Sequence, residues 1–367
     1  MKVSELKSVV HKFGGSSVAN VECLQHVVDI VRKEYALVQS REGDGSTLYV
    51  VVSAFGGVTN AIVELIELAE GRREYQDKLS ALHERHLAVL QHFENSIPNL
   101  PAAYRSKASQ LCSKLQQDIQ DIADVLRAVY LCRSHCNEMF ELLTGYGEQW
   151  SVQILRLILE LQLRDSVRCE YMDARDVLVV DKCEGTNHPW VQWGVCRAKL
   201  EAWRNKYLPA GIVVVTGYIA SNSKGLATTL QRNGSDFSAT ILGALCLASS
   251  VTIWTDVNGV FTADPSKVES AQPVLQMSYE EAVELSYFGA KVLHPLCLSP
   301  LIEPNIPLYI RNTFNYENKG TKVCRISNET QTEKSSHNLG SLIHPPVQNA
   351  VKGFSSIENL ALLNVEG

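Results

Sequence analysis

The sequence predicts an α/β protein whose central, mostly parallel sheet is covered by helices on both faces. Residues 47–53 read Thr-Leu-Tyr-Val-Val-Val-Ser, a nearly continuous apolar run of the kind that forms strands buried on both faces. Similar β-branched runs, and amphipathic segments between them, recur at 167–171, 190–205, 211–215, 236–248 and 251–255. Because strands that alternate with helices are joined by crossover connections, this order favours parallel pairing.

The first predicted elements are a short strand at 8–11 and an amphipathic helix that begins at residue 18. Residues 12–17, Lys-Phe-Gly-Gly-Ser-Ser, join them. The two glycines allow the backbone to approach an anion, the start of the helix favours negative charge there, and the lysine adds a cation. The segment therefore predicts a phosphate-binding loop, with a tight turn that carries an incidental lysine as the alternative.

Residues 60–165 predict a series of helices, because apolar residues recur at helical spacing and Pro98 and Pro101 interrupt the pattern. This helical segment is longer than an ordinary crossover connection between two strands, so we expect it to form a helical subdomain that packs beside the sheet. It should return to the sheet at a turn that contains Gly147 and Glu148.

Residues 216–230 predict a β-hairpin. The loop that follows, Gln-Arg-Asn-Gly-Ser-Asp at 231–236, has the same design as the first loop and leads into a helix. Ser235 or Asp236 could cap that helix.

Composition excludes several classes of protein. The 367 residues include 34 Lys and Arg against 40 Asp and Glu, a net charge of −6 without a basic block, so we expect no nucleic-acid partner. No apolar run approaches the roughly 18 residues that span a bilayer, so we expect no membrane partner. The amino terminus lacks the apolar core of a signal peptide, which predicts a cytoplasmic location.

The ten cysteines are scattered, mostly among apolar residues, which predicts reduced thiols. Cys132, His135 and Cys136 lie on neighbouring turns, but no second ligand pair lies near them in the sequence. We therefore expect no metal site made by protein side chains.

Taken together, six segments resemble the aspartate kinase family of amino-acid kinases; they lie at 12–17, 52–54, 147–148, 232–236, 254–260 and 288–295. The last reads Phe-Gly-Ala-Lys-Val-Leu-His-Pro. The resemblance extends from about residue 8 to the end, and residues 277–295 are most similar to kinases fused to homoserine dehydrogenase. It implies an amino-acid kinase fold, with ATP-dependent phosphorylation of the β-carboxylate of L-aspartate, the first step towards lysine, threonine and methionine. It also implies Mg²⁺, a homo-oligomer and possible C-terminal fusion to homoserine dehydrogenase.

The resemblance also implies roles for individual residues. Lys12 contacts the phosphates and Asp236 orients it, as the catalytic pair. The residues implied to hold ATP are Lys12, Gly14, Gly15, Ser16, Thr255, Asp256, Phe261, Asp264, Lys267 and Lys291. Those implied to line the aspartate site are Ser53, Thr59, Glu148, Arg232 and Ser235.

Within that site, Arg232 would hold the α-carboxylate and Glu148 the α-ammonium group. Three of these residues have a purely structural alternative role: Asp236 as a helix cap, Lys267 as a solvated side chain and Phe261 as a core residue. Two positions depart from the family pattern: Gln231 replaces a usual glycine, and Phe261 replaces a common tyrosine.

The implied reaction needs charge neutralisation more than a base, because a carboxylate nucleophile is already ionised at pH 7. Lys12, the glycine amides, two helix amino termini and Mg²⁺ would supply it. Two alternatives to an aspartate kinase remain open. One is an enzyme of the same fold that phosphorylates glutamate derivatives, carbamate or nucleoside monophosphates. The other is a regulatory chain of this fold without catalytic activity.

We expect a catalytic domain at 1–313 with its helical subdomain at about 60–165. A polar connector follows at 314–350. By the resemblance, 351–367 are the first strand of a truncated regulatory domain of the ACT type.

Overall fold

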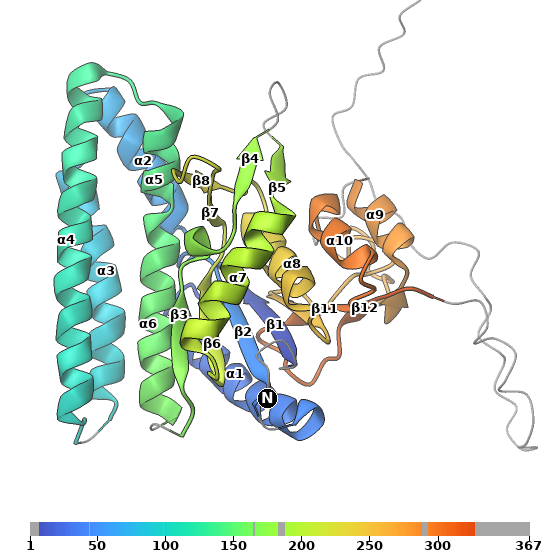
Figure 1. Ribbon diagram of the computed structural model, residues 1–367. Coiled ribbons are helices and arrows are strands. Elements are labelled where there is room, and N and C mark those ends of the chain that lie inside the picture. The colour runs from blue at the N-terminus through green and yellow to red at the C-terminus, as the bar shows by residue number, and fades with distance from the viewer. Residues whose placement is uncertain are drawn as a thin grey trace, which may run out of the picture.

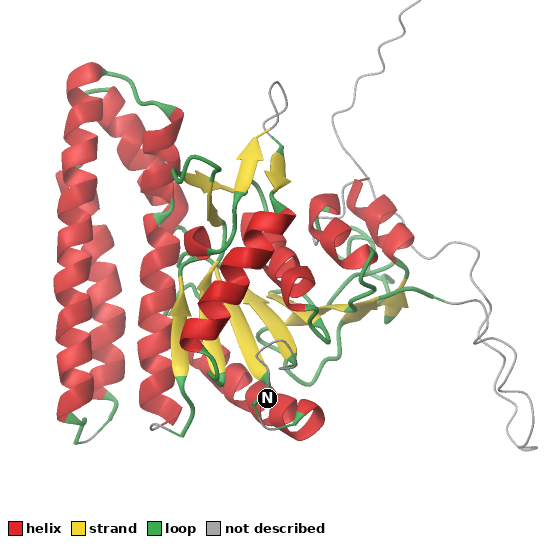
Figure 2. Ribbon diagram, in the orientation of Figure 1, coloured by secondary structure: helices red, strands yellow, loops and turns green. Residues whose placement is uncertain are grey.

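The computed structural model describes residues 7–43, 45–97, 99–163, 166–182, 188–287 and 293–326. In this part of the chain a single large sheet runs through the middle of the molecule, with helices on both faces (Figures 1 and 2). Its strands, in chain order, are β1 (Ser8–Phe13), β2 (Thr47–Val52), β3 (Cys169–Met172), β6 (Ile212–Thr216), β9 (Val251–Thr255), β10 (Gln276–Met277), β11 (Leu308–Asn312) and β12 (Thr321–Val323).

The strand order across the sheet is β10-β12-β11-β9-β1-β2-β6-β3. Every neighbouring pair is parallel except β11 and β12, which are antiparallel. The predicted α/β class with a mostly parallel sheet is therefore confirmed. Because β1 and β2 lie in the middle, the loops at their carboxyl ends face each other near the centre of the molecule.

Two hydrophobic cores lie on opposite faces of the sheet. Successive residues of β2 alternate between them: Val50 and Val52 belong to one core, and Tyr49 and Val51 to the other. Helices α1 (Val21–Glu42) and α6 (Tyr146–Leu163) cover the first face. Helices α7 (Trp193–Tyr207) and α8 (Gly234–Cys246) cover the second, and α10 (Pro295–Ile302) packs on α8.

In the described part of the region predicted to be helical there are five helices. Besides α6 they are α2 (Val58–Glu70), α3 (Gln76–Asn95), α4 (Ala102–Cys132) and α5 (Asn137–Thr144). Their apolar faces share one core with α1 and the sheet, and Figure 1 shows α3 and α4 as the outermost layer. Helices α2 to α5 therefore form a second layer outside α6, and α6 packs between this layer and the sheet.

The structure corrects one predicted boundary. The first helix begins at Val21 rather than at residue 18, because Asn20 is its N-cap and accepts a hydrogen bond from the Cys23 amide at 2.8 Å. Residues 15–20 form turns and bends instead.

The predicted hairpin at 216–230 is confirmed as the antiparallel pair β7 (Ile219–Ser221) and β8 (Ala227–Thr229). A second hairpin, β4 (Val180–Lys182) with β5 (Pro189–Val191), the 3₁₀ helix η2 (Ala174–Asp176) and α9 (Tyr279–Tyr287) were not predicted. The polar stretch expected to be a connector from 314 contributes β12 to the sheet. The part of it beyond 326, and the expected strand at 351–367, lie outside the described residues.

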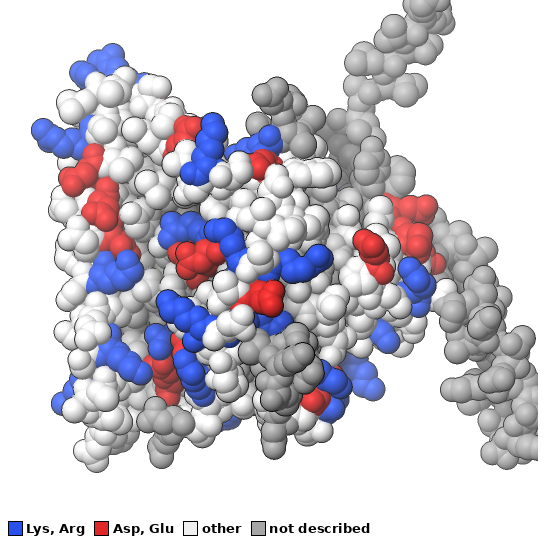
Figure 3. Space-filling model, in the orientation of Figure 1, with Lys and Arg blue, Asp and Glu red and all other residues white. Residues whose placement is uncertain are grey.

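No helix in the described ranges has both the length and the apolar character that a membrane crossing needs. Basic and acidic side chains are interspersed over the face that Figure 3 shows, in keeping with the small net charge of −6.

Candidate active site

A pocket of about 340 Å³ lies where β1, β2 and β6 end and where α2 and α8 begin. Lys12 comes from β1, Ser53 follows β2, and Tyr218 follows β6. The crevice outside the carboxyl ends of parallel strands is the usual ligand site of open α/β sheets. The remaining described lining residues are Gly15, Ala54, Phe55, Gly56, Gly57, Thr59, Asn60, Glu148, Gln231, Asn233, Gly234, Ser235 and Asp236.

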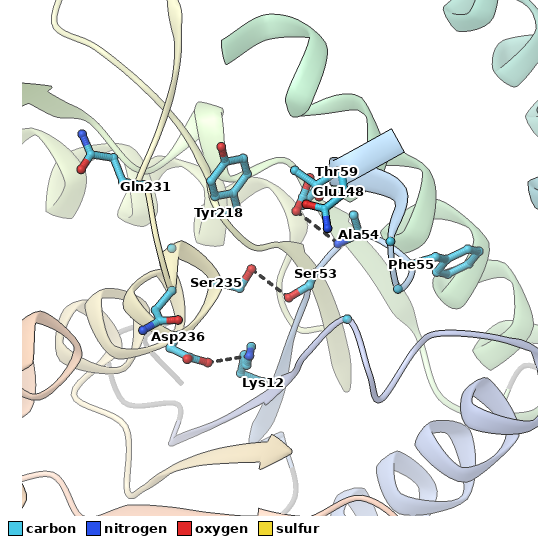
Figure 4. Close-up of a pocket in the computed structure, with 16 residues that line it drawn as sticks. Lys12, Ser53, Ala54, Phe55, Thr59, Glu148, Tyr218, Gln231, Ser235 and Asp236 are labelled. Atoms are coloured by element: carbon cyan, nitrogen blue, oxygen red, sulfur yellow. Dashed lines mark hydrogen bonds and ion pairs between the residues drawn. The ribbon is translucent and has the colours of Figure 1, made fainter. Parts of the chain in front are cut away.

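Lys12 and Asp236 form an ion pair inside this pocket. Lys12 Nζ lies 2.5 Å from Asp236 Oδ1, and only 11% and 12% of the two side chains are exposed. Asp236 sits in the first turn of α8, but it does not cap that helix. The N-cap is Asn233, so the alternative interpretation of Asp236 as a cap is wrong, because its carboxylate turns into the pocket to pair with the lysine (Figure 4).

Ser53 and Ser235 connect the two sides of the pocket. The Ser53 hydroxyl donates to Ser235 Oγ at 2.9 Å, joining the loop after β2 to the first turn of α8. Figure 4 shows this pair between the Lys12–Asp236 ion pair and Glu148. The structure thus brings together four segments that are far apart in the sequence, through Lys12, Ser53, Glu148 and the neighbours Ser235 and Asp236.

Glu148 is a buried carboxylate that faces the pocket from the first turn of α6. Its Oε1 accepts a hydrogen bond from the Ala54 amide at 3.2 Å, while Oε2 has no hydrogen-bond partner among the described residues. Burial raises the pKa of Glu148 from the usual 4.5 to about 8, although the Ala54 amide opposes the shift. A cationic ligand group placed at Oε2 would remove this penalty.

Gly147 permits the close approach that puts Glu148 there. A Cβ at this position would lie 2.8 Å from both Ala54 Cβ and Val58 Cγ1. The start of α6 therefore packs directly on the loop between β2 and α2.

Two helices point uncapped amino termini at the pocket. Gly57 precedes α2 and Asn233 precedes α8, both in the left-handed region with φ of 83° and 58°, and neither helix has a side-chain cap among the described residues. The first amide of each helix donates to a carbonyl of the preceding loop, Val58 to Phe55 and Gly234 to Gln231, both at 2.9 Å. The attraction for an anion therefore comes from the next amides and from the positive end of each helix. The sequence predicted the terminus of α8, whereas α2 takes the place of α1, the helix predicted to follow the glycine loop.

Arg232 lines an adjoining pocket of about 380 Å³. Thr59, Tyr218 and Gln231 line both pockets, so the two lie side by side. Arg232 is exposed at the rim. The other residues of this second pocket are Asn137, Phe140, Glu141, Lys182 and Thr229.

The wall of the second pocket contains a buried polar cluster. Glu141 forms an ion pair with Lys182 and accepts hydrogen bonds from the Thr228 and Thr229 hydroxyls at 3.1 and 3.2 Å. This cluster fixes α5 against both hairpins beside Arg232.

The residues expected on the nucleotide side lie elsewhere. Thr255 ends β9 and donates to Asp256 Oδ1 at 3.2 Å. Asp264 Oδ1 accepts from the Ser266 amide and hydroxyl at 2.9 and 2.6 Å, so this carboxylate organises its own turn.

Neither pocket includes any of these residues, nor the half-buried Phe261, the exposed Lys267, Gly14 or the exposed Ser16, among its described lining. Lys291 lies outside the described residues.

Sequence reasoning missed Tyr218 and gave no structural reason for Gln231. Both have positive φ, 64° and 60°, in the left-handed region that is strained for a residue with a side chain. The family's usual glycine at 231 meets that requirement without strain, which is why the Gln231 departure matters. The sequence feature that could have indicated Tyr218 as a pocket residue is its position two residues after a buried strand.

Comparison with known proteins identifies the family. The profile of the amino acid kinase family matches residues 7–312. The chain belongs to this family. A bifunctional aspartokinase/homoserine dehydrogenase from Daucus carota is 38% identical over 98% of this chain. The chain covers only 35% of that protein, about a third of its length.

A lysine-sensitive aspartokinase 3 from Escherichia coli is 31% identical over 86% of this chain and 64% of its own length. Among solved structures, Escherichia coli aspartokinase III in complex with aspartate and ADP superposes with a TM-score of 0.70. The two are 29% identical, and the match covers 88% of this chain and 66% of that one. The amino-acid kinase fold expected from the resemblance is thereby confirmed.

Proposed function

We propose that this chain transfers the γ-phosphoryl group of ATP to the β-carboxylate of L-aspartate. The observation that carries the proposal is the pocket itself. It holds a buried carboxylate with one unpartnered oxygen, Glu148, opposite the cationic end of the Lys12–Asp236 pair. A ligand with an ammonium group at one end and an anion at the other suits both, and the family relatives named above are aspartokinases.

The proposed binding mode uses both pockets. The substrate ammonium group pairs with Glu148, and its α-carboxylate reaches Arg232, whose planar guanidinium can hold a carboxylate by two parallel hydrogen bonds. The β-carboxylate then points towards Lys12, beside the Ser53–Ser235 pair. Thr59 lies where the two pockets join and would contact the middle of the substrate.

In this mechanism the residues of the chain neutralise and orient charge. The β-carboxylate is already ionised, so no side chain has to remove a proton. Asp236 holds the Lys12 ammonium in place, and Lys12, the Gly15 backbone and the amino termini of α2 and α8 stabilise the negative charge on the transferred group. Removal of one comparable donor reduces turnover by roughly a hundredfold or more in known enzymes.

Mg²⁺ would enter with the nucleotide, since triphosphate oxygens supply most ligands of this ion. No group of three or more metal-binding side chains occurs among the described residues, and Asp236 is the acidic side chain in the pocket that could add a ligand beside the phosphates. The ion would neutralise phosphate charge.

We assign the rest of the nucleotide site by family resemblance. It comprises Gly14, Ser16, Thr255, Asp256, Phe261, Asp264, Lys267 and Lys291. We further propose that the protein divides into domains at 1–313, 314–350 and 351–367 and is fused to homoserine dehydrogenase. We also propose that it forms a homo-oligomer and lies in the cytoplasm. The plant relatives are named chloroplastic.

A coupled assay of ADP release tests the proposal. L-aspartate should support turnover, whereas D-aspartate, glutamate and acetylglutamate should support little. The span from Glu148 to Lys12 selects the length of the substrate, and the third contact, at Arg232, selects its handedness. Chemical trapping of the acyl phosphate with hydroxylamine provides a second readout. Faster turnover with glutamate or acetylglutamate than with L-aspartate would assign another substrate, and no turnover with any of them would favour the regulatory chain without catalytic activity.

A further inference from the structure

Arg85 joins the two loops that line the candidate pocket, although it lies outside the pocket on helix α3. Its Nη2 donates to the backbone carbonyl of Ala19 at 2.7 Å and to that of Gly56 at 2.8 Å. Ala19 belongs to the turn after β1, and Gly56 to the loop after β2. One nitrogen of one side chain therefore holds both loops.

The two loops lie in direct contact at Gly56, which has no side chain. A Cβ on Gly56 would lie 2.9 Å from Ala19 Cβ and 3.0 Å from the Gly15 carbonyl oxygen. Gly15 and Gly56 both line the pocket. Since two carbonyl oxygens that point towards one place repel each other, a shared cationic donor stabilises this arrangement.

The next residue of α3 supports the same loop. His86 is buried, and its ring stacks on Phe55 with centroids 5.1 Å apart and planes 8° apart. His86 also makes a T-shaped contact with Trp150 in α6, with ring centroids 4.8 Å apart. Phe55 lines the pocket, and Trp150 lies two residues after Glu148 (Figure 4 shows Phe55).

We propose that Arg85 is a positioning residue that sets the spacing between the glycine loop at 14–19 and the loop at 53–57. The first loop follows Lys12, which faces the phosphates in the proposed binding mode, and the second begins at Ser53, which lies beside the substrate carboxylate. The distance between the two loops therefore sets the distance between the phosphate-binding and the carboxylate-binding parts of the pocket. Arg85 touches neither reactant. The proposal rests on the proposed function for its kinetic consequence alone.

The kinetic test compares Arg85→Met and Arg85→Lys in the same chain. A misplacement of about 1 Å between reacting groups reduces turnover by up to about a hundredfold, so the methionine variant should lose at least tenfold in kcat with a smaller change in KM. Lysine also carries several donor hydrogens on one nitrogen, so the lysine variant should recover most of that loss.

Arg72→Met is the matched control. Arg72 also donates to two backbone carbonyls, those of Tyr130 and Leu131, both at 3.3 Å, but it does so away from the pocket. It should change the stability of the fold without changing kcat. An equal loss of kcat in Arg72→Met and Arg85→Met, or no loss in Arg85→Met, would overturn the proposal.

Hydrogen exchange separates this proposal from the proposed function, because it needs no substrate. The amides of Ser17 and Val18 bond the Gly14 carbonyl, and the Val58 amide bonds that of Phe55. In Arg85→Met these amides should exchange at least tenfold faster than in Arg72→Met. If they do so while L-aspartate supports no turnover, the proposed function fails and the positioning role stands; unchanged exchange overturns the positioning role.

Discussion

Glu148 is costly to ionise in the free protein, because its carboxyl group is buried, and it is also the residue proposed to recognise the substrate ammonium group. Because its pKa rises from 4.5 to about 8 on folding, the folded chain binds more protons than the unfolded chain between these values. The free protein therefore loses stability as pH rises through this window, and no penalty exists below it. A ligand ammonium group reverses the effect by stabilising the ionised carboxylate.

Glu148→Gln should separate stability from recognition. Because glutamine, unlike Glu148, does not have to take up a proton on folding, the free energy of unfolding should increase by roughly 3 kcal/mol at pH 7, while the affinity for aspartate falls at least tenfold. Denaturant titration and calorimetric titration with aspartate measure the two quantities. A variant that is both less stable and unchanged in aspartate affinity would contradict both the electrostatic argument and the ammonium assignment.

Lys12 should prove essential for turnover and coupled to Asp236 for stability. In Lys12→Met the Asp236 carboxylate stays buried without its partner, which typically costs about 3–5 kcal/mol. Turnover should become undetectable.

The double variant Lys12→Met with Asp236→Asn supplies the control. It leaves no buried charge, so most of the lost stability should return while turnover does not. Recovery of turnover in the double variant, measured as ADP release at saturating substrate, would remove Lys12 from the catalytic pair.

At the scale of elements, the start of α6 reaches the pocket only because Gly147 has no side chain. Gly147→Ala should push α6 away from the loop after β2, reducing stability by about 1–3 kcal/mol as overpacking does. The KM for aspartate should rise, because Glu148 moves with the helix.

Gly194→Ala in α7 is the matched control for this prediction. A Cβ at Gly194 meets nothing within 4 Å, and alanine favours a helix by up to about 1 kcal/mol over glycine, so this variant should be as stable as the parent or more stable. Denaturation midpoints and aspartate KM values measured side by side decide the matter, and an unchanged KM in Gly147→Ala would mean that α6 does not set the position of Glu148.

At the scale of the whole molecule, two buried histidines make folding sensitive to acid. His11 lies in β1 and accepts a hydrogen bond from Trp254 Nε1, and His86 lies in α3; burial lowers the pKa of each from 6.5 to about 4. Between these values the unfolded chain binds more protons, so stability is complete above 6.5 and is lost as pH falls towards 4.

We expect each histidine to reduce stability by about 2 kcal/mol between pH 7 and pH 5. The test uses the Glu148→Gln background, since Glu148 changes stability in the opposite sense over this range. His86→Phe, which keeps a ring against Phe55, should remove about half of the remaining acid sensitivity. An identical pH dependence with and without His86 would show that this histidine does not titrate on unfolding.

The sequence by itself determined the class of fold, the strands β1, β2, β3, β6 and β9, the hairpin at 216–230 and the segments that carry the chemistry. These features are local. Apolar runs, glycine loops and helical spacing are written in neighbouring residues, and a buried strand such as Thr47–Val52 looks buried whatever it packs against.

Only the tertiary structure decided how side chains from distant segments meet. Asp236 could cap its own helix or pair with Lys12, and the packing of α8 beside β1 selects the ion pair. The bond between Glu148 and the Ala54 amide and the bridge from Arg85 to Ala19 and Gly56 likewise depend on how α6 and α3 dock on the sheet. No local pattern encodes such contacts, because their geometry is set by the packing of whole elements against one another.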